Sequence, residues 1–311
     1  MTILLSTKLS DWMTNDALRD VLKPLLPDTP IVCREETVAA DAVRMLVVDR
    51  LDPGEAAGYP NLQVIQKLGA GVETIVRQQD LPDGVRIARL KPKAAADEMT
   101  RYALAHVLDD QLNLAHYRAD QPAHRWHPRA PRKMAETVIG VLGLGHIGGS
   151  IATAFSSLGF RVIGYSRSPR PTGPVECHTG EDGLRTVLAE SDYLIAVLPS
   201  TEATRGLMNA ERFSQMKPGA HFMNIGRGDL VDDDALLDAV DRFHLAGAVL
   251  DVFHVEPLPA DHAFWTHNRI RITPHISGWH VDDGLQDVAE NYRRLEAGET
   301  LINEISVALG Y

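Results

Sequence analysis

Short hydrophobic runs alternate with longer amphipathic stretches along the first hundred residues of the chain. Each run is bounded by polar residues, which is typical of β-strands. The predicted strands are residues 2–6, 30–34, 44–49, 62–68 and 85–90, with helix-like segments such as 10–25 and 71–79 between several of them. Strands that alternate with helices predict an α/β layer on a mainly parallel sheet.

A long helical pattern over residues 96–117 separates this region from a second series of strands. Its apolar side chains recur at helical spacing; they are Leu104, Val107, Leu108, Leu112 and Ala115. Residues 118–135 then become irregular, basic and rich in proline. The second series of predicted strands is 137–142, 161–165, 193–198, 220–225, 247–252 and 269–273, followed by a helix at 281–297.

Composition narrows the classes of protein that fit this pattern. With 311 residues, 44% of them hydrophobic, the chain is long enough for two domains, each with its own core. The formal net charge of −11 argues against general nucleic-acid binding. The two cysteines form no disulfide framework, the N-terminus lacks the pattern of a signal peptide, and no apolar run approaches the roughly 18 residues of a membrane span. We therefore expect a cytoplasmic protein without membrane or nucleic-acid partners.

A glycine-rich turn stands between the predicted strand at 137–142 and an apolar helix. Gly143, Gly145 and Gly148 match GxGxxG in the segment GLGHIG. The first glycine permits a tight turn, the second lets a pyrophosphate approach the backbone, and the third lets helix and strand pack closely. The strand before and the helix after supply the context that a dinucleotide site requires, whereas a glycine turn without a ligand is the alternative.

The next predicted strand ends without the acid that usually binds the adenosine ribose of NAD. Its end has the sequence YSRSPR, and Ser166 stands 21 residues after Gly145, close to where the acid belongs. Without the acid, a 2′-phosphate is not repelled; Ser166 offers it a hydroxyl, and Arg167 can bind it with its forked guanidinium. Arg170 is a second candidate contact. These residues predict NADPH; the alternative is a basic surface turn that tolerates NADH.

Three polar residues follow successive strands further along the chain. Arg227 lies between two glycines, Glu256 lies in a loop after the next strand, and His275 follows Pro274. The carboxyl ends of strands line the ligand crevice of a doubly wound sheet, so all three are expected on its rim. Arg227 can bind the carboxylate of a 2-keto acid, His275 can protonate the carbonyl oxygen, and Glu256 can orient the imidazole. Each residue alone also fits a turn or a surface position, and only their joint placement predicts catalysis.

Several motifs resemble, in order and spacing, the D-isomer-specific 2-hydroxyacid dehydrogenases. They are KLGAGVETI, GLGHIG, LPSTEATRGLMN, MNIGRGDLVDDDAL, LDVFHVEPLP and ITPHISG, and they span about residues 60 to 280. Within that family, YSRS, DVFHVEPLP and the terminal ALGY are most similar to the A-type glyoxylate/hydroxypyruvate reductases. The resemblance implies reduction of a small 2-keto acid, such as glyoxylate or hydroxypyruvate, with NADPH.

The resemblance also implies roles for individual residues. Arg227, Glu256 and His275 would be the catalytic set, and Asp251 would hold the nicotinamide carboxamide. The other implied cofactor contacts are Arg227 and His275 themselves, together with His146, Ile147, Leu198, Pro199, Thr204, Ile225, Gly226 and Ser277. The backbone of Gly69, Ala70, Gly71 and Val72 would bind the substrate carboxylate. The loop of residues 49–59 adds Arg50, either as a second positive group for the substrate or as a solvated surface residue.

The family architecture implies two doubly wound parallel-sheet domains. A flavodoxin-like substrate domain would comprise residues 1–97 and 280–311, and a Rossmann cofactor domain, residues 98–279, would be inserted in it. Residues 117–135 resemble an arm that crosses to a second subunit in a homodimer. Trp126 in this arm would then reach the neighbouring active site, or else pack locally.

Three other functions are compatible with the sequence. One is a non-catalytic NAD(P)-sensing protein of the corepressor kind, and another is a dehydrogenase of the same family with a larger 2-keto acid. A metal-dependent enzyme is the third, because the chain has 13 histidines. The pairs His124/His127 and His275/His280 lack accompanying carboxylate or cysteine ligands, so we expect no metal site.

Overall fold

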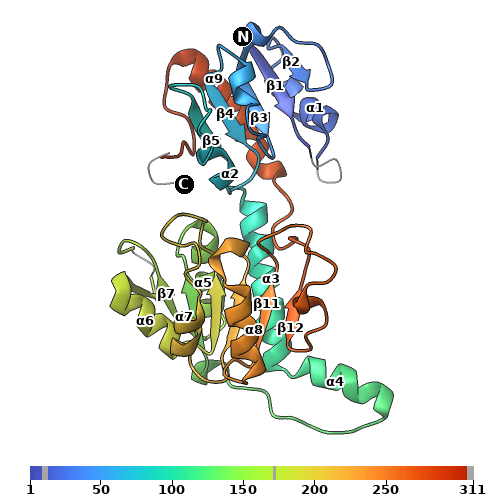
Figure 1. Ribbon diagram of the computed structural model, residues 1–311, viewed down its shortest axis with the longest axis vertical. Coiled ribbons are helices and arrows are strands. Elements are labelled where there is room, and N and C mark those ends of the chain that lie inside the picture. The colour runs from blue at the N-terminus through green and yellow to red at the C-terminus, as the bar shows by residue number, and fades with distance from the viewer. Residues whose placement is uncertain (9–12, 171–172, 307–311) are drawn as a thin grey trace. The chain divides into compact units, whose positions relative to one another are not determined.

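The computed structural model describes residues 1–8, 13–170 and 173–306. The chain divides into two compact units: unit 1 comprises Met1–Ala95 and Trp279–Tyr311, and unit 2 comprises Ala96–Gly278. The sequence of unit 2 is therefore inserted in that of unit 1, as the colours of Figure 1 show. The start of the helix predicted at 10–25 and the terminal ALGY lie outside the described residues.

Unit 1 is built on a five-stranded parallel sheet of order β2-β1-β3-β4-β5. Its strands are β1 (Thr2–Ser6), β2 (Ile31–Cys33), β3 (Val43–Val48), β4 (Val64–Lys67) and β5 (Arg86–Arg89). Its α-helices are α1 (Asn15–Leu25), α2 (Glu73–Val76) and α9 (Leu285–Ala297). This strand order is that of flavodoxin-like sheets.

Successive side chains of β1 point to opposite faces of the sheet of unit 1, and both faces are buried. Ile3 and Leu5 belong to one core, which α1 and α9 cover, while Leu4 belongs to a second core with α2 on the other face. Helix α9 packs beside α1, although the two lie at opposite ends of the sequence. The C-terminal helix therefore completes the domain that the N-terminal strands begin.

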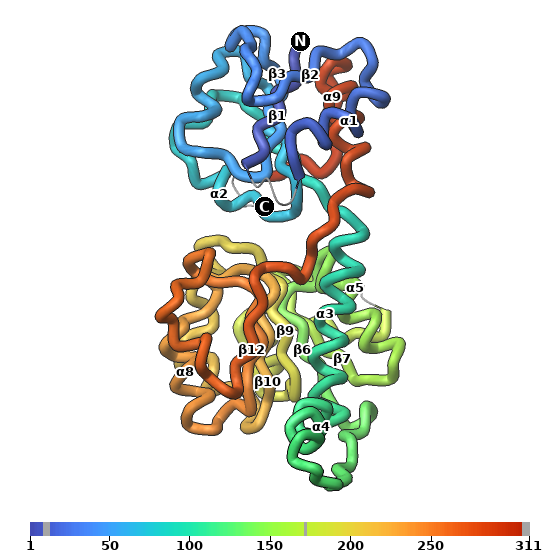
Figure 2. The backbone as a smooth tube through the Cα atoms, turned by 90° about the vertical axis from the view of Figure 1, so that its right-hand side faces the viewer, coloured from blue at the N-terminus to red at the C-terminus, as the bar shows by residue number. Residues whose placement is uncertain are grey.

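Unit 2 is built on a seven-stranded parallel sheet of order β12-β11-β10-β9-β6-β7-β8 (Figure 2). Its strands are β6 (Val138–Leu142), β7 (Arg161–Tyr165), β8 (Glu176–His178), β9 (Tyr193–Ala196), β10 (His221–Asn224), β11 (Gly247–Leu250) and β12 (Ile270–Ile272). Its α-helices, the first of which begins in unit 1, are α3 (Lys93–Gln111), α4 (Leu114–Asp120), α5 (His146–Ser157), α6 (Gly180–Glu190), α7 (Ala210–Gln215) and α8 (Asp233–Asp241). Helices α3 and α5 contribute to the core on one face, and α6, α7 and α8 to the core on the other.

The strand order of unit 2 reverses between β6 and β9. In a doubly wound sheet, ligands bind at the carboxyl ends of the strands beside such a reversal. The two-domain α/β fold with parallel sheets, predicted from the sequence, is confirmed.

The structure corrects the sequence prediction for one helix, for the segment that follows it and for one strand. The helix predicted over 96–117 is not continuous, because Asn113 adopts a left-handed backbone (φ 57°) that ends α3 and starts α4. Asparagine tolerates this conformation better than most residues. Helix α4 also runs on to Asp120, into the segment expected to be irregular, and strand β8 was not predicted. Every predicted strand is present, most of them shorter than expected.

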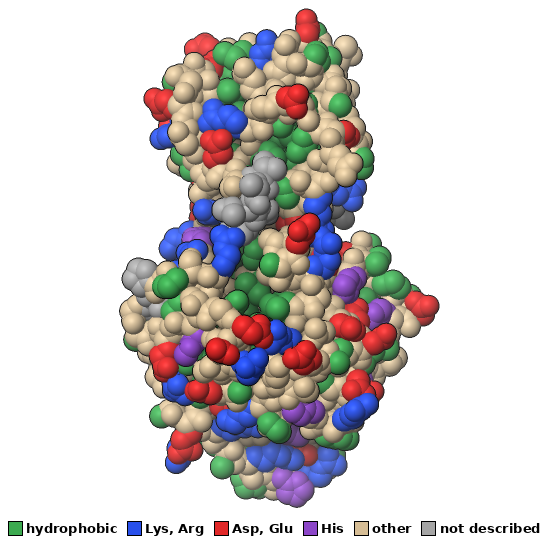
Figure 3. Space-filling model, turned by 60° about the vertical axis from the view of Figure 1, so that its left-hand side comes forward, with side chains coloured by type: hydrophobic (Ala, Val, Ile, Leu, Met, Phe, Trp, Pro, Cys, Tyr) green, Lys and Arg blue, Asp and Glu red, His purple; other side chains and the backbone are tan. Residues whose placement is uncertain are grey.

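Two features concern the expectation that the protein has no nucleic-acid or membrane partner: the surface charge and the length and polarity of the helices. On the face that Figure 3 shows, acidic and basic side chains are interspersed rather than gathered by sign. Across the three described ranges, every helix falls short of the length or apolar character that crossing a membrane requires.

Candidate active site

The glycine-rich turn connects β6 to α5. Gly143 has a left-handed backbone (φ 102°), and its N–H donates to the carbonyl of Tyr165 at 2.8 Å. A Cβ on Gly148 would lie 1.8 Å from the carbonyl oxygen of Gly143, so the helix can approach the turn only with glycine there. A Cβ on Gly145 would meet nothing within 4 Å. The turn thus leaves open space beside the start of α5, as a bound pyrophosphate requires.

The two residues after Gly145 occupy different surroundings. His146 is exposed at the first position of α5, while Ile147 is partly buried and packs on the core beneath α3 and α5. The exposed position of His146 suits a phosphate contact, whereas Ile147 contributes to helix packing.

Strand β7 ends in a turn that carries Ser166 and Arg167. Ser166 is buried, and its hydroxyl donates to the carbonyl of Ser168 and lies 3.5 Å from the sulfur of Cys177 on β8. The Ser166 N–H donates to the carbonyl of His178 at 3.0 Å. Arg167 and Arg170 are exposed. The structure therefore uses the Ser166 hydroxyl to form the turn and presents guanidinium groups at the end of the strand.

The loop after β9 is closed by Thr204. Its hydroxyl donates to the carbonyl of Pro199 at 2.6 Å and accepts from the N–H of Thr201 at 2.8 Å. Leu198 and Pro199 are half-buried. A Cβ on Gly226 would lie 2.8 Å from the carbonyl oxygen of Leu198, so the loops after β9 and β10 touch through their backbones.

Arg227 is placed by the last residue of β10. The buried Asn224 side chain donates to the carbonyl of Arg227 at 2.8 Å and accepts from the N–H of Gly226 at 3.1 Å. A Cβ on Gly228 would lie 2.0 Å from the carbonyl carbon of Phe253, in the loop after β11. Asn224 was not among the predicted site residues, although a polar residue at the end of a buried strand was a signal. The neighbouring Ile225 is buried.

His275 and Glu256 form a hydrogen-bonded pair. His275 Nδ1 lies 2.7 Å from Glu256 Oε2, and Glu256 Oε1 accepts from the N–H of Phe253 at 3.0 Å. Burial raises the pKa of Glu256, but the hydrogen bond and charge of His275, the Phe253 N–H and the charge of Arg227 outweigh it and hold that pKa below its ordinary value. The side chains of His275 and Glu256 are 48% and 37% exposed. The pair is therefore accessible and includes a carboxylate near Arg227.

Asp251 holds the segment around His275. The carboxylate is fully buried and accepts from the N–H groups of Ile276 at 2.9 Å and Ser277 at 2.8 Å, and from the hydroxyl of Thr273. These three donors flank His275 on both sides. Asp251 thus positions the histidine, a contact that the sequence did not predict; a contact to the nicotinamide carboxamide stays a prediction.

The remaining predicted substrate residues of unit 1 follow β3 and β4. Gly69 has a left-handed backbone (φ 109°), the carbonyl of Ala70 accepts from Arg89 Nη1 at 2.9 Å, and Val72 is buried. Gly71 connects these residues to α2. Arg50 is 63% exposed, with its Nε 3.8 Å from Asp52. These positions belong to unit 1, whereas Arg227, Glu256 and His275 belong to unit 2.

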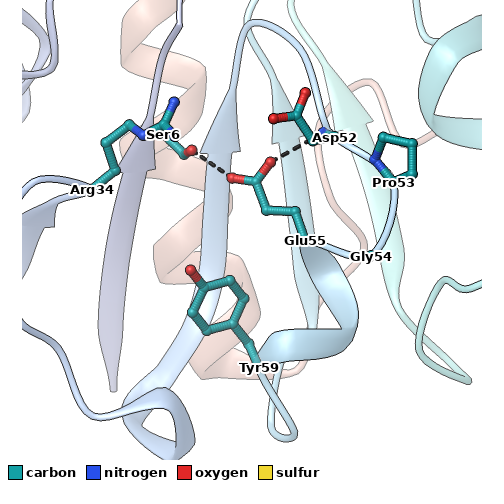
Figure 4. Close-up of a pocket in the computed structure, with 7 residues that line it drawn as sticks. All are labelled: Ser6, Arg34, Asp52, Pro53, Gly54, Glu55 and Tyr59. Atoms are coloured by element: carbon teal, nitrogen blue, oxygen red, sulfur yellow. Dashed lines mark hydrogen bonds between the residues drawn. The ribbon is translucent and has the colours of Figure 1, made fainter.

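A polar pocket of about 420 Å³ lies beside the loop of Arg50 (Figure 4). Its lining residues are Ser6, Arg34, Asp52, Pro53, Gly54, Glu55 and Tyr59. The Glu55 carboxylate accepts from the Ser6 hydroxyl at 2.6 Å and from the N–H of Asp52 at 3.1 Å. These bonds tie the loop after β3 to the end of β1, and so fix the segment that carries Arg50.

The predicted arm is anchored at its base and presents Trp126 to solvent. The buried Asp120 accepts from Arg129 at 2.6 Å and Arg125 at 2.8 Å, and these bonds lower the pKa of Asp120 to about 2. Trp126 is 94% exposed, so it does not pack locally. Figure 1 shows the arm as a long loop beyond α4.

Within the described residues, no group of three or more His, Cys, Asp or Glu side chains is arranged to hold a metal ion.

Comparisons with known proteins agree with this architecture. The sequence profile of the NAD binding domain of D-isomer specific 2-hydroxyacid dehydrogenases matches residues 104–277. Glyoxylate/hydroxypyruvate reductase A from Photorhabdus laumondii is 40% identical over 261 residues, which cover 82% of this chain and 83% of the relative. The enzyme of the same name from Serratia proteamaculans is 38% identical over the same lengths.

Solved structures resemble the whole chain. A D-isomer specific 2-hydroxyacid dehydrogenase from Xanthobacter autotrophicus in complex with NADPH and MES has a TM-score of 0.93 and 34% identity, covering 100% of this chain and 99% of its own. An NADPH-dependent glyoxylate/hydroxypyruvate reductase from Sinorhizobium meliloti in complex with NADP and sulfate has a TM-score of 0.90 and 27% identity, with the same coverage. The chain therefore belongs to the family of D-isomer specific 2-hydroxyacid dehydrogenases.

Proposed function

We propose that this protein reduces a small 2-keto acid, such as glyoxylate or hydroxypyruvate, to the 2-hydroxy acid with NADPH. The names of the relatives described above support this reaction. The observation that carries the proposal is the hydrogen bond between His275 Nδ1 and Glu256 Oε2, beside the turn that holds Arg227. This arrangement provides a proton donor and a cation for one carboxylate-bearing substrate.

Each of the three side chains has a separate task in the proposed reaction. Because Glu256 occupies Nδ1, the Nε2 atom of His275 is left to give a proton to the substrate carbonyl oxygen. Glu256 keeps the imidazole oriented and stabilises its protonated form. The guanidinium of Arg227 binds the substrate carboxylate and offsets the negative charge that develops on the carbonyl oxygen.

The residues of unit 2 fit NADPH. A Cβ on Gly145 would occupy the space that the turn leaves beside α5, and the exposed Arg167 follows Ser166, which stands where NAD-binding folds carry an acid. When bound, NADPH supplies the hydride that adds to C2 of the substrate. Arg167, and Arg170 as a second group, would hold the 2′-phosphate, while the buried Ser166 shapes the turn from which they extend.

The two units would divide the work. We propose that the backbone of Gly69 to Val72 in unit 1 contributes to binding the substrate carboxylate, with Arg50 as a second positive group, and that unit 2 binds the cofactor and supplies Arg227, Glu256 and His275. The exposed Trp126 and its anchored loop support a homodimer formed through the arm.

A cytoplasmic location agrees with the two free cysteines, Cys33 in unit 1 and Cys177 in unit 2.

An assay with a panel of 2-keto acids tests the proposal. Purified protein is mixed with NADPH or NADH and with glyoxylate, hydroxypyruvate, pyruvate or a larger branched 2-keto acid, and cofactor oxidation is followed. We expect fastest turnover with NADPH and the two small polar acids. Stoichiometric cofactor binding without oxidation would point to a sensor instead, and fastest turnover of the branched acid would point to a dehydrogenase of larger substrates.

A further inference from the structure

We propose that Tyr102, on helix α3, is a positioning residue for His275 that acts through Thr273 and Asp251. The inference rests on the proposed function, because it assigns Tyr102 a part in the same reaction. The hydroxyl of Tyr102 lies 2.7 Å from the hydroxyl of Thr273, and the Thr273 hydroxyl donates to the buried carboxylate of Asp251.

The direction of these hydrogen bonds follows from the atoms involved. A carboxylate offers acceptor oxygens only, so Thr273 must give its one hydroxyl proton to Asp251. The oxygen of Thr273 then accepts, and the proton between Thr273 and Tyr102 comes from Tyr102. Burial raises the pKa of Tyr102 to about 12, so its hydroxyl keeps this proton at neutral pH.

These hydrogen bonds hold the segment around His275, whose backbone conformation is uncommon. His275 has a left-handed backbone (φ 55°), which is uncommon for any residue except glycine, and its N–H donates to the carbonyl of Thr273 at 3.0 Å. The Asp251 carboxylate binds Thr273 on one side of His275 and the N–H groups of Ile276 and Ser277 on the other. A shift of Asp251 would therefore move the imidazole relative to the substrate.

Tyr102 is itself held in one orientation. Its ring contacts that of His106, one helical turn further along α3, with ring centroids 4.5 Å apart and the ring planes tilted by 53°. Helix α3 packs on the sheet of unit 2 through Met99, Ala103 and Val107. The hydroxyl thus extends from a helix fixed in the core to the loop that carries the proton donor, and it fixes where that loop begins.

The test compares Tyr102→Phe with Thr273→Val and Thr273→Ser. Tyr102→Phe keeps the ring and removes only the donor, and Thr273→Val removes the middle of the chain. We expect each to lower kcat about tenfold, with the dissociation constant of NADPH unchanged within about twofold. Thr273→Ser keeps the hydroxyl and should retain most of the activity. The double variant should lose no more than either single variant, because both break one chain of hydrogen bonds.

Tyr193→Phe is the matched control. Tyr193 is another tyrosine of unit 2, more deeply buried than Tyr102, and its hydroxyl donates to Asp110, but it lies at the amino end of β9, opposite the strand ends that carry the site. This variant should lower the melting temperature as Tyr102→Phe does while leaving kcat unchanged. A Tyr102→Phe enzyme with wild-type kcat, or losses that multiply in the double variant, would overturn the proposal.

A second readout does not depend on turnover. Hydrogen exchange of the Ile276 and Ser277 amides, which donate to Asp251, should become about tenfold faster in Tyr102→Phe and stay unchanged in Tyr193→Phe. If the wild-type protein reduced no 2-keto acid, the proposed function would fail, and exchange would still decide whether Tyr102 positions the loop. Unchanged exchange in Tyr102→Phe would overturn the positioning role even in an active enzyme.

Discussion

His275 Nδ1 lies 2.7 Å from Glu256 Oε2, although the two residues belong to loops that follow different strands, β12 and β11. The two strands are neighbours in a parallel sheet, so their carboxyl ends lie at the same edge. The contact fixes which imidazole nitrogen remains for the substrate. It also makes the two residues depend on each other, so a change in Glu256 should affect His275.

Glu256→Gln should lower stability only where the wild-type carboxylate is charged. The pKa of Glu256 in the folded protein lies below its ordinary value. Stability from this group is therefore present above the unfolded pKa of about 4.3 and is lost as the pH falls through the lower folded pKa. Because the side chain is 37% exposed, solvent screening limits the difference to less than about 1 kcal/mol.

Urea unfolding of wild type and Glu256→Gln from about pH 3 to about pH 7 measures this difference. The two curves of unfolding free energy should separate above about pH 4.3 and converge at lower pH. Curves that separate further toward acid pH would contradict the lowered pKa of Glu256.

Arg227→Lys should weaken the recognition of the substrate carboxylate. Lysine keeps the positive charge but lacks the planar fork that binds a carboxylate through two hydrogen bonds. We expect KM for glyoxylate to rise and kcat to fall, about tenfold each, while NADPH affinity stays unchanged. Arg242→Lys, in an exposed ion pair with Asp238, is the control and should match wild type. If Arg227→Lys altered only NADPH affinity, its role in substrate binding would be wrong.

Arg167→Ala should reduce the preference for NADPH. Loss of one charged contact to the 2′-phosphate should lower kcat/KM for NADPH roughly 10- to 100-fold, with little change for NADH. This variant is cleaner than Ser166→Asp, because aspartate cannot donate to the Ser168 carbonyl and would also disturb the turn. The exposed Arg185→Ala on α6 serves as the control. Equal losses with both cofactors, or a wild type that prefers NADH, would refute the assignment.

Trp126→Ala should weaken the proposed homodimer. A tryptophan that is 94% exposed in one chain is a typical centre of binding energy in an interface, worth at least about 2 kcal/mol. Because the substitution removes a tryptophan from each of the two subunits, sedimentation equilibrium should show a dimer for wild type and a dissociation constant about 10³-fold higher for the variant. Trp265→Ala should leave the dimer intact, because Trp265 is bound to its own loop through the Pro259 carbonyl. A monomeric wild type would rule out the arm as a dimer contact.

Local patterns in the sequence predicted most of the strands and the glycine-rich turn. Hydrophobic runs bounded by polar residues located every predicted strand, and the glycine spacing located the turn after β6. Arg227, Glu256 and His275 could be predicted together because the carboxyl ends of parallel strands share one edge. The short edge strand β8 (Glu176–His178) was not predicted because its sequence, ECH, contains no hydrophobic run, unlike that of the equally short β2 and β12.

The contacts that position the site could not be predicted from the sequence. Tyr102, Asp251 and Thr273 find their partners across segments that belong to different elements, and no local pattern states which donor meets which acceptor. The buried hydroxyl of Ser166 illustrates the same limit, because its sequence position indicated a ligand contact whereas its bond to Ser168 forms a turn. Such roles depend on tertiary packing rather than on spacing.

The most direct test of the account is glyoxylate reduction by His275→Asn with saturating NADPH, together with NADPH binding by the same protein. Asparagine can still hydrogen-bond to Glu256 but cannot donate a proton to the carbonyl oxygen as an acid. We predict that kcat falls by about 10²- to 10⁴-fold while the dissociation constant of NADPH stays within about twofold of wild type. Turnover within about tenfold of wild type would contradict the assignment of His275 as proton donor.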